Sequence, residues 1–474
     1  MKRVALLGVL LLACGEAQSF RGFNLVLVNI DTLRPDHLGA YGYTRDTSPF
    51  IDSLAREGVV FEQALSNSSF TRESVSTLFS GRLPSASGSV GWGATPAADT
   101  QTLGERLQAA GYRTGFFSMT TLLTDPAYTR GFDEHQHLTT VWGLSRGSGK
   151  VSERALEFVT REPGKPFMLY LHYLDPHGPY EPPPEMYQRF AKEPFANPVG
   201  LYMEARPRLE RLLQEGFGPG EPRFEDMVLR YDAEIADTDR ALARLFEGLA
   251  PLGVLDRTLV VITADHGEEF LEHGFLEHGW TLFQESVRIP LVFFAKGLPP
   301  QRVAARVSTV DVAPTVLALL EIAHEGPSEG SALFRRDDGR WEIEAPKQPY
   351  IGELLIPERN VVRTVIAGKW KYVAAQRWVP PAQRVKAEKR QWLGLEPPQV
   401  DVWGPPVSEA LYDLTQDPHE TRNLAETRPE VRARLAASLK AYQTYAQRHA
   451  PPAAPRPART EEDAERLRAL GYLE

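Results

Sequence analysis

Two strongly apolar runs of this chain each end at an aspartate. Residues 24–30 (Asn-Leu-Val-Leu-Val-Asn-Ile) lead into Asp31, and residues 258–263 (Thr-Leu-Val-Val-Ile-Thr) lead, one residue later, into Asp265 and His266. Runs of this length that are rich in valine and isoleucine are typical of buried parallel strands. Open α/β sheets place their ligand sites just beyond the carboxyl ends of such strands. The pattern therefore predicts that these polar side chains converge on one crevice.

Helical spacing of apolar positions alternates with further apolar runs along the first two thirds of the chain. The segment 224–249 has helical spacing and leads directly into the run that ends at Asp265. A helix that feeds a parallel strand in this way is expected of a right-handed crossover. We therefore predict an α/β fold with a mostly parallel central sheet flanked by helices. The other predicted elements are helices over 49–57 and 103–110 and strands over 112–119 and 166–173.

Beyond Pro314 the elements become shorter. After a helix over 311–320, strand-like segments at 361–367 and 370–374 alternate with glycine- and charge-rich stretches, and a helix follows over 429–449. This predicts a smaller C-terminal antiparallel sheet with a helix packed on it. The predicted division is a signal segment and tether at 1–19, a catalytic α/β domain at 20–330, an α+β subdomain at 331–450, and a linker with a terminal helix at 451–474.

The N-terminus has the pattern of an export signal. Lys2 and Arg3 precede an apolar stretch over 4–13 that is too short to span a bilayer as a helix. Residues 11–14 (Leu-Leu-Ala-Cys) resemble a bacterial lipobox, and Cys14 is the only cysteine, which excludes intrachain disulfides. We expect a periplasmic or outer-membrane lipoprotein that meets the membrane only through a lipid on Cys14. The alternative is an ordinary secretory signal that contains a cysteine.

Composition narrows the range of partners. The 474 residues, of which 42% are hydrophobic, are enough to bury a large core. The formal net charge is -9 and the chain has no long basic run. Because phosphate binding needs a concentrated positive surface, a nucleic-acid partner is not expected.

The polar residues at the strand ends indicate metal chemistry. Two carboxylates and an imidazole make a plausible divalent-cation site, since a cation offsets the repulsion between Asp31 and Asp265. The alternative is that Asp31 caps a turn and His266 packs against it. A third polar cluster, which contains Asp175 and His177, follows the predicted strand over 166–173.

Six motifs, in order along the chain, together resemble the sulfatase family of the alkaline phosphatase superfamily. The similarity covers nearly all of the chain after the signal, and bacterial lipoprotein members are the most similar type. The motifs are residues 29–42 (Asn-Ile-Asp-Thr-Leu-Arg-Pro-Asp-His-Leu-Gly-Ala-Tyr-Gly), the helix from Ser48 to Phe61, Asp175-Pro176-His177, Asp265-His266-Gly267-Glu268, Arg288-Ile289-Pro290, and Leu411-Tyr412-Asp413-Leu414 together with Asp417-Pro418 and Asn423-Leu424.

This resemblance implies that Asp31, Asp265 and His266 bind one divalent cation, which would be calcium, magnesium or manganese. Aligning Gly81-Arg82 with the end of the family's nucleophile motif places Thr71 in the nucleophile position and Ser74 on the motif's serine, which would contact the substrate. The chain departs from the motif at two positions: it has valine in place of the arginine and glutamate in place of the proline.

A threonine nucleophile changes the expected chemistry. Classical sulfatases oxidise the motif's cysteine or serine to formylglycine, whose hydrate expels sulfate through a second hydroxyl. Thr71 has only one hydroxyl, so an ester on it must be released by attack of water or another acceptor, a route that suits phosphoryl transfer. The superfamily's nucleotide phosphodiesterases and glycerol-phosphate transferases typically use threonine. Thr71 could instead be the N-cap of a helix over 74–80, and Ser69 and Ser74 are competing hydroxyls.

Histidines complete the expected site. His177 and His278 are candidates for binding the anion or protonating the leaving group, and His278 lies roughly where sulfatases carry a lysine. Each could instead be a structural loop histidine. His172 and Asp175 are further candidates for substrate binding, although His172 could simply finish the strand and Asp175 could cap the turn.

The number of cations is a separate question. Asp36 and His37 could hold a second metal, but Asp36 more simply caps a short helix. Thr32 stands where many sulfatases have a second aspartate, so we expect one cation bound by Asp31, Asp265, His266, Thr71 and water.

Three functions remain open at this level. The first is a metal-dependent hydrolase or transferase that uses Thr71 on a phosphate or sulfate ester of a small molecule, glycan or lipid. The second is a true sulfatase that works without formylglycine. The third is a noncatalytic protein that keeps the anion pocket.

Overall fold

Strand β1 (Asn24–Ile30) lies inside the main sheet and ends immediately before Asp31. The computed structural model describes residues 19–91, 95–138, 147–191, 209–338, 340–356, 360–377 and 405–451. β1 pairs in parallel with β6 (Thr258–Thr263) on one side and with β5 (Phe167–Tyr173) on the other. Every residue of these three strands is buried. The two apolar runs are therefore adjacent parallel strands, as predicted.

Nine strands of the described chain form the main sheet, in the order β11-β2-β10-β6-β1-β5-β3-β4 with β9 beside β2. Neighbours pair in parallel from β6 to β4 and between β2 and β11, whereas β10 and β9 run antiparallel to their partners. The predicted mostly parallel sheet is confirmed. Its other strands are β2 (Val59–Leu65), β3 (Arg113–Ser118), β4 (Glu134–His137), β9 (Arg288–Ile289), β10 (Leu291–Phe294) and β11 (Gln301–Ser308).

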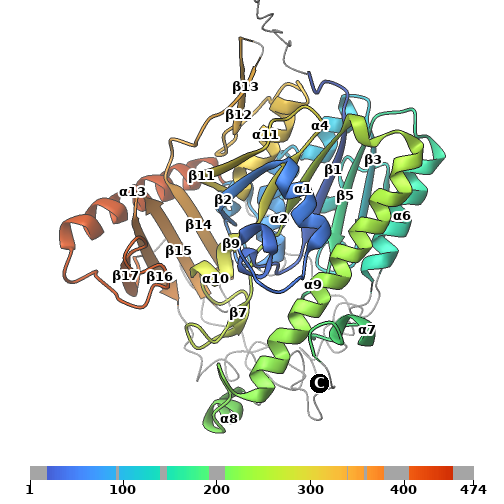
Figure 1. Ribbon diagram of the computed structural model, residues 1–474. Helices are drawn as coiled ribbons and strands as arrows, with labels where there is room; N and C mark the ends of the chain where they lie inside the picture. The colour runs from blue at the N-terminus through green and yellow to red at the C-terminus, as the bar shows by residue number, and fades with distance from the viewer. Residues whose placement is uncertain are drawn as a thin grey trace, which may run out of the picture.

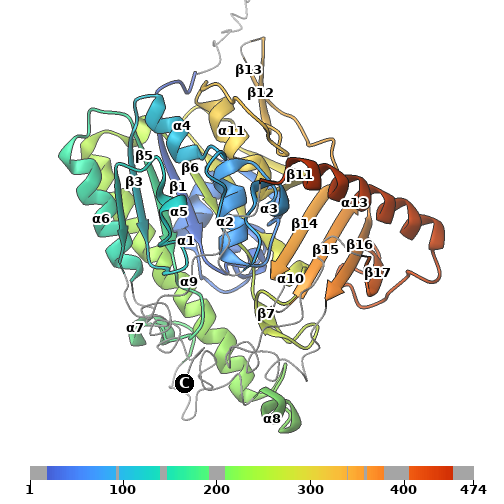
Figure 2. The same cartoon turned by 180° about the vertical axis from the view of Figure 1, so that it is seen from behind.

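Helices cover both faces of this sheet. Figure 1 shows α1 (Pro49–Glu57), α6 (Ser148–Arg161) and α9 (Pro222–Leu249) in front of the strands, where α9 contacts both α1 and α6. Figure 2 shows α2 (Thr71–Ser80) and α4 (Leu103–Ala109) on the opposite face. Helix α11 (Val312–Leu319) contacts α2. This layering buries the central strands on both sides, as their continuous apolar sequences require.

The bounds of α1 follow from its sequence. Pro49 occupies the first turn, where its missing N–H costs no hydrogen bond. Ile51 and Leu54 lie on the buried side of the helix. The helix ends at Gly58, where a Cβ atom would lie 2.5 Å from the carbonyl oxygen of Phe293 in the adjacent strand. Only glycine lets the chain pass this close to the sheet.

Helix α2 spans Thr71–Ser80 and begins three residues earlier than predicted. Its N-cap position is Phe70, which makes no side-chain capping hydrogen bond. Thr71 is therefore the first residue of the helix, and the interpretation of Thr71 as an N-cap is wrong. Phenylalanine is not a capping residue type, so the sequence does not indicate that the helix begins directly after Phe70.

A second sheet follows the main domain. Strands β14 (Tyr350–Ile356), β15 (Asn360–Ala367), β16 (Trp370–Arg377) and β17 (Ser408–Asp413) pair antiparallel in this order, and α13 (Pro429–His449) packs on them, as predicted. The smaller elements are α3 (Pro84–Ser87), α5 (Pro126–Thr129), α7 (Pro184–Tyr187), α8 (Leu209–Gln214), α10 (Gln284–Val287), β7 (Glu269–Phe270), β8 (Leu276–Glu277), β12 (Phe334–Asp337) and β13 (Arg340–Ile343).

A buried polar cluster joins the second sheet to the main domain. Glu353 and Arg363 are both fully buried and form an ion pair of 2.8 Å. The Glu353 carboxylate also accepts hydrogen bonds from the backbone N–H of Ser85 at 3.0 Å and the hydroxyl of Tyr442 at 2.9 Å. Nearby, the Glu73 carboxylate in the first turn of α2 accepts the N–H of Leu355 at 3.1 Å. The helix that starts at Thr71 is thus fastened to both sheets.

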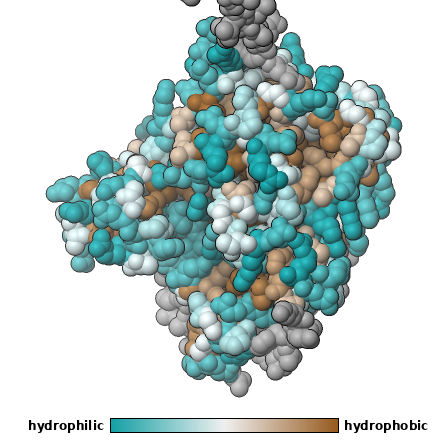
Figure 3. All heavy atoms as spheres, viewed as in Figure 1, coloured by the Kyte–Doolittle hydropathy of each residue, from teal (hydrophilic) through white to brown (hydrophobic). Residues whose placement is uncertain are grey.

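Figure 3 shows a predominantly hydrophilic face with scattered apolar residues. Among the described helices, none combines the length and apolar character needed to cross a membrane. The predicted signal segment up to residue 18, with Cys14, and the predicted terminal helix over 460–474 lie outside the described residues.

Candidate active site

The carboxyl ends of the central strands bring the predicted acidic residues together. Asp31 follows β1 and Asp265 follows β6, and these strands are neighbours. His172 lies on β5, on the other side of β1. Asp31, His172 and Asp265 each offer a ligand atom, these atoms all lie within 4.8 Å of one another, and all three residues are buried. The predicted convergence of Asp31 and Asp265 is found.

His266 lies between the acidic residues and the candidate nucleophile. Its Nε2 atom is 3.8 Å from Asp31 Oδ1, 3.6 Å from Asp265 Oδ2 and 3.2 Å from Thr71 Oγ1. Its Nδ1 atom lies 3.0 Å from the carbonyl oxygen of Gly267. Because a carbonyl only accepts hydrogen bonds, Nδ1 carries the proton, and Nε2 presents a lone pair to the site. This is the tautomer that a metal ligand needs.

Buried oxygen atoms give an independent indication of a cation. Asp31 Oδ1, Asp265 Oδ2 and Thr32 Oγ1 are buried and have no hydrogen-bond partner among the described residues. Burial, and next the negative charge of the neighbouring Asp265, raise the pKa of Asp31 from its ordinary 3.8 to about 7. Two buried carboxylates without a counter-charge are unfavourable. The donor set of hard oxygens and one imidazole therefore fits a divalent cation.

Thr32 takes an unusual backbone conformation beside this cluster. Its φ of 57° lies in the left-handed region, which is rare for a β-branched residue. Its backbone N–H points to Asp265 Oδ1 at 3.4 Å. Strained residues of this kind persist where the surrounding structure holds them, and they concentrate at functional sites.

The three candidate hydroxyls differ in their partners. Ser69 Oγ donates to the carbonyl of Thr281 at 2.6 Å, and Ser74 Oγ donates to the carbonyl of Asp265 at 2.6 Å. Thr71 Oγ1 instead contacts the His266 ring and is fully buried at the first turn of α2. The free amides and dipole of a helix N-terminus favour an anionic group there. Of the three, Thr71 has the hydroxyl that contacts the ring of His266.

His177 and His278 join the same site. The ring centroid of His278 is 4.3 Å from that of His266 and 4.8 Å from that of His177. His177 Nδ1 lies 2.6 Å from the carbonyl oxygen of Gly178, and His278 Nδ1 lies 2.9 Å from Glu268 Oε1. The structure thus brings both predicted histidines next to the proposed metal ligands.

His172 and Asp175 occupy different surroundings. His172 Nε2 lies 3.3 Å from Asp31 Oδ2, while its Nδ1 is 3.2 Å from Asn29 Nδ2 and 2.8 Å from the hydroxyl of Tyr170. Burial lowers the pKa of His172 to about 4, so the ring is neutral. The Asp175 carboxylate accepts the hydroxyl of Ser148 at 2.8 Å and is 3% exposed. His172 therefore contacts Asp31 in the acidic cluster. The hydrogen bond of Asp175 is instead with Ser148 in α6.

Asp36 and His37, the alternative ligands for a second cation, pair with other side chains. Asp36 pairs with Arg34 at 2.8 Å, and His37 Nδ1 lies 2.7 Å from a carboxylate oxygen of Asp232 on α9. Neither residue belongs to the metal-ligand group found among the described residues. Asp36 lies within a single 3₁₀ turn rather than at its cap.

Sequence reasoning gave no role to Glu268, Tyr180 or Asn29. Glu268 is the last residue of the motif that contains Asp265 and His266, which was a usable signal. Asn29 is a polar residue two positions before Asp31, and residues two apart lie on the same side of a strand. This alternation was a weaker signal. Tyr180 is recognisable only once its hydroxyl is found 2.9 Å from Glu268 Oε2.

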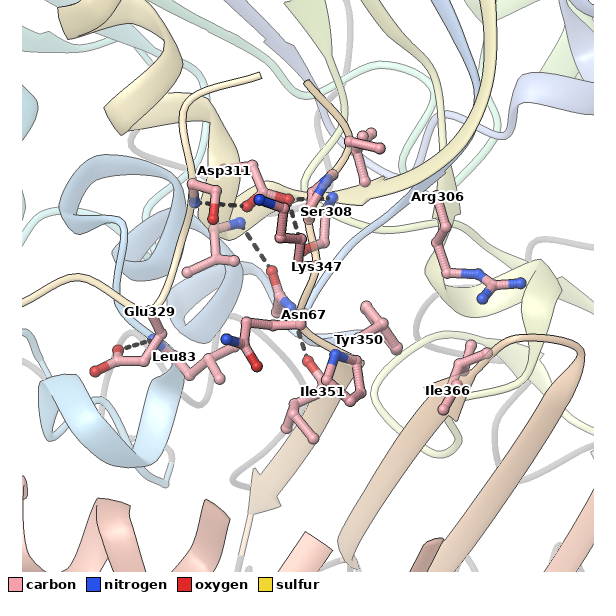
Figure 4. A pocket seen from close by; sticks show the side chains of 18 of the residues that line it. Asn67, Leu83, Arg306, Ser308, Asp311, Glu329, Lys347, Tyr350, Ile351 and Ile366 are labelled. Atoms are coloured by element: carbon pink, nitrogen blue, oxygen red, sulfur yellow. Dashed lines mark hydrogen bonds between the residues drawn. The ribbon is translucent and has the colours of Figure 1, made fainter. Parts of the chain in front are cut away.

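A separate cavity of about 290 Å³ lies between β11 and the second sheet. Figure 4 shows Asn67 and Asp311 lining it with their polar groups already paired. Asn67 donates to the carbonyl of Ile351 at 2.7 Å and accepts the N–H of Val310 at 2.9 Å, and Asp311 accepts the N–H of Ser308 at 2.8 Å. Of these bonds, the one from Asn67 to Ile351 links the main domain to the second sheet.

Comparison with known proteins identifies relatives of the chain. Residues 23–322 match the family model described as Sulfatase. A delta 4,5-hexuronate-2-O-sulfatase of Bacteroides thetaiotaomicron is 22% identical over 453 residues, which spans 87% of this chain and 87% of that protein.

Solved structures share the same fold. One, in complex with its substrate D-glucosamine-2-N,6-O-disulfate, matches with a TM-score of 0.70 at 18% identity and covers 90% of this chain and 98% of that one. A phosphonate monoester hydrolase of Agrobacterium radiobacter matches with a TM-score of 0.67 at 18% identity, over 90% of this chain and 96% of that one. The predicted alkaline phosphatase-like fold is confirmed.

Proposed function

Because this chain belongs to the sulfatase family and is a sulfuric ester hydrolase of that family, we propose that Thr71 is its nucleophile and that one divalent cation binds at Asp31, Asp265 and His266. The observation that carries this proposal is the 3.2 Å contact between Thr71 Oγ1 and His266 Nε2, beside two buried carboxylate oxygens that have no hydrogen-bond partner among the described residues. Calcium, magnesium and manganese all suit these donors.

The proposed reaction has two steps. Thr71 Oγ1 bonds to the sulfur or phosphorus of the ester, its hydroxyl proton passes to water, and the leaving oxygen takes up a proton and departs as an alcohol. A water oxygen then attacks the same sulfur or phosphorus atom. The bond between that atom and Thr71 Oγ1 breaks, and Thr71 Oγ1 takes up a proton from the attacking water, so that the threonine hydroxyl forms again. When bound, the cation would lower the pKa of the attacking hydroxyl and offset charge on the transferred group.

We further propose that phosphate or phosphonate esters react by this route more readily than sulfate esters. Thr71 has no second hydroxyl with which to expel sulfate, so release depends on attack at the central atom. Phosphoryl groups undergo such attack readily when charge on their oxygens is stabilised. One of the structural neighbours is a phosphonate monoester hydrolase.

Charge also restricts the ester. The ionised carboxylates of Asp31 and Asp265 balance one divalent cation, and Glu268 adds a further buried carboxyl group beside the histidines. A monoanionic ester, such as a sulfate monoester or a phosphodiester, therefore adds less repulsion than a dianionic phosphate monoester. A glycan or lipid could carry either kind of ester.

Paired substrates test this function. Hydrolysis of para-nitrophenyl sulfate and of bis-para-nitrophenyl phosphate is measured on the purified protein with and without each metal. We expect metal-dependent hydrolysis, a loss of about 10³-fold or more in Thr71→Val, and retention of most activity in Thr71→Ser. Full activity in Thr71→Val would exclude Thr71 as the nucleophile. Inactivity of the wild-type protein on both substrates would favour the noncatalytic anion-binding alternative.

We also propose that the protein is exported and anchored by a lipid on Cys14. The basic, apolar and lipobox-like sequence of the first 14 residues supports this proposal. Labelling with a fatty-acid probe in a bacterial host tests it. Wild-type protein should carry the label and Cys14→Ser should not, whereas a signal of the ordinary secretory kind would leave both unlabelled.

A further inference from the structure

The C-terminal motif at residues 411–424 has no part in the proposed reaction, yet one residue within it reaches the chain segment that follows His278. Glu420 is buried in the turn after β17. Its Oε2 atom accepts the backbone N–H of Gln284 at 2.7 Å, and its Oε1 atom lies 2.5 Å from Lys371 Nζ. Its φ of 53° lies in the left-handed region, which is uncommon for glutamate.

The polar residues of the motif shape the turn that presents Glu420. The Asp417 carboxylate accepts the backbone N–H of Arg422 at 2.8 Å, which closes the turn. The side-chain oxygen of Asn423 accepts the N–H of Leu411 in β17 at 3.0 Å. These bonds stay within the motif, whereas the carboxylate of Glu420 bonds a residue 136 positions earlier in the chain. The contact of Glu420 is therefore the one that carries the motif to the main domain.

The second sheet holds the backbone of residues 280–284 at every other residue. Asn360 in β15 donates to the carbonyl of residue 280 at 2.5 Å. Lys371 in β16 donates to the carbonyl of residue 282 at 2.6 Å. The N–H that Glu420 accepts belongs to residue 284. Three buried side chains from separate parts of the C-terminal subdomain thus fix one short stretch of backbone.

The chain around His278 takes conformations that its own sequence does not favour. Glu277, directly before it, has a φ of 66°, and Leu271 has a φ of 69°. Side chains other than glycine rarely adopt this region, and such residues persist where contacts from elsewhere hold them. The ring centroid of His278 lies 4.3 Å from that of His266. A shift of this segment would therefore move a ring that lies within the candidate active site.

We propose that Glu420 of the C-terminal motif positions the segment 278–284, and through it His278, in the active site. The inference rests on the proposed function, because it takes His278 to be a residue of that site. Lys371 and Asn360 hold carbonyl groups of the segment, and Glu420 holds its last N–H. Glu420 is a positioning residue that acts through the backbone, and the second sheet is part of the scaffold of the site.

Removal of a single N–H tests this role. Gln284 is the first residue of α10 and follows the extended Phe283, so proline fits there and removes the N–H that Glu420 accepts. Gln284→Ala is the matched control, since it removes the same side chain and keeps the N–H. In hydrogen exchange followed by mass spectrometry, amides of residues 278–287 should exchange about 10- to 100-fold faster in Gln284→Pro than in Gln284→Ala. Peptides from β1 should exchange equally in both.

Activity on the para-nitrophenyl esters should follow the same order. We expect kcat/KM to fall about 10-fold or more in Gln284→Pro and less than about 3-fold in Gln284→Ala, because small displacements of an active-site group lower the rate. The pair Glu420→Gln and Glu420→Ala repeats the test if proline prevents folding. The amide oxygen of Glu420→Gln can still accept the N–H, so this variant should keep slower exchange and higher activity than Glu420→Ala.

Arg363→Met is the control for general loss of stability. It breaks a second buried ion pair of the same sheet, in which Glu353 bonds Ser85 and Tyr442 rather than the segment after His278. It should not speed exchange of residues 278–287 relative to the rest of the second sheet.

Each outcome bears on a distinct claim. Equal exchange of residues 278–287 in Gln284→Pro and Gln284→Ala would overturn the positioning role of Glu420, and so would an equal rise in Arg363→Met. Faster exchange with unchanged kcat/KM would also overturn it, because the position of His278 would then not matter. Full activity of Thr71→Val would instead refute the proposed function. Exchange is measured without substrate, so the two failures are distinguishable.

Discussion

Replacing Asp31 by asparagine tests the buried acidic pair without requiring a substrate. In the metal-free protein, Asp31 and Asp265 share a buried site. One carboxylate oxygen of each has no hydrogen-bond partner among the described residues. Asparagine keeps the shape of the side chain and removes its charge. We expect Asp31→Asn to stabilise the metal-free protein at alkaline pH and to weaken its response to divalent cations.

The magnitude follows from the pKa of Asp31. Burial, together with Asp265, raises it from an ordinary 3.8 to about 7. Between these two values the folded protein keeps a proton that the unfolded chain has released, so stability falls as the pH rises. About three pH units at about 1.36 kcal/mol each correspond to roughly 4 kcal/mol, of which about 3 kcal/mol falls between pH 5 and pH 8. The loss is complete above pH 7.

Urea unfolding of chelator-treated protein at pH 5 and pH 8 measures this effect. The stability of wild type relative to Asp31→Asn should fall by about 3 kcal/mol between these pH values. Adding calcium, magnesium or manganese at pH 8 should raise the stability of wild type more than that of the variant, because the cation binds only the folded site.

A control residue separates this site from burial in general. Burial also raises the pKa of Asp239 to about 7, but its carboxylate accepts backbone N–H groups of Phe50 and Ile51 in α1. Asp239→Asn should alter the pH dependence and keep the full response to metal. If wild type and Asp31→Asn showed the same pH dependence and the same metal response, the reasoning about the acidic pair would be refuted.

Three further substitutions probe the supports of the site and the fold. His172→Gln removes the ring that contacts Asp31 and should weaken metal affinity by about 10- to 100-fold in a titration of the metal-free protein; unchanged affinity would show that this contact does not support the ligand. Arg363→Met leaves the buried Glu353 without its cation and should cost about 3–5 kcal/mol in urea unfolding, and a loss below about 1 kcal/mol would contradict this account. Gly58→Ala places a Cβ atom 2.5 Å from a backbone oxygen of β10 and should lower the melting temperature, while an unchanged value would mean that the strand moves aside freely.

The sequence alone determined the layers of the fold and the acidic part of the site. Continuous apolar runs specified that β1 and β6 are buried strands, and the residue at which each run stops specified Asp31 and Asp265. Helical spacing likewise located α9 and α13. These features are local, because strand and helix periodicity is written in neighbouring residues.

Only the tertiary structure decided which partner each polar side chain meets. Helix α2 begins after Phe70, which cannot cap it through its side chain, and Ser74 links this helix to a carbonyl that lies 191 positions further along the chain. Tyr180 and Glu268 are 88 positions apart, and Asn29 and His172 are 143 apart. Periodicity shows which face of an element a residue occupies, but the register between distant elements determines whether two polar atoms lie at hydrogen-bond distance. The acidic ligands could therefore be predicted, whereas the groups that orient the histidines could not.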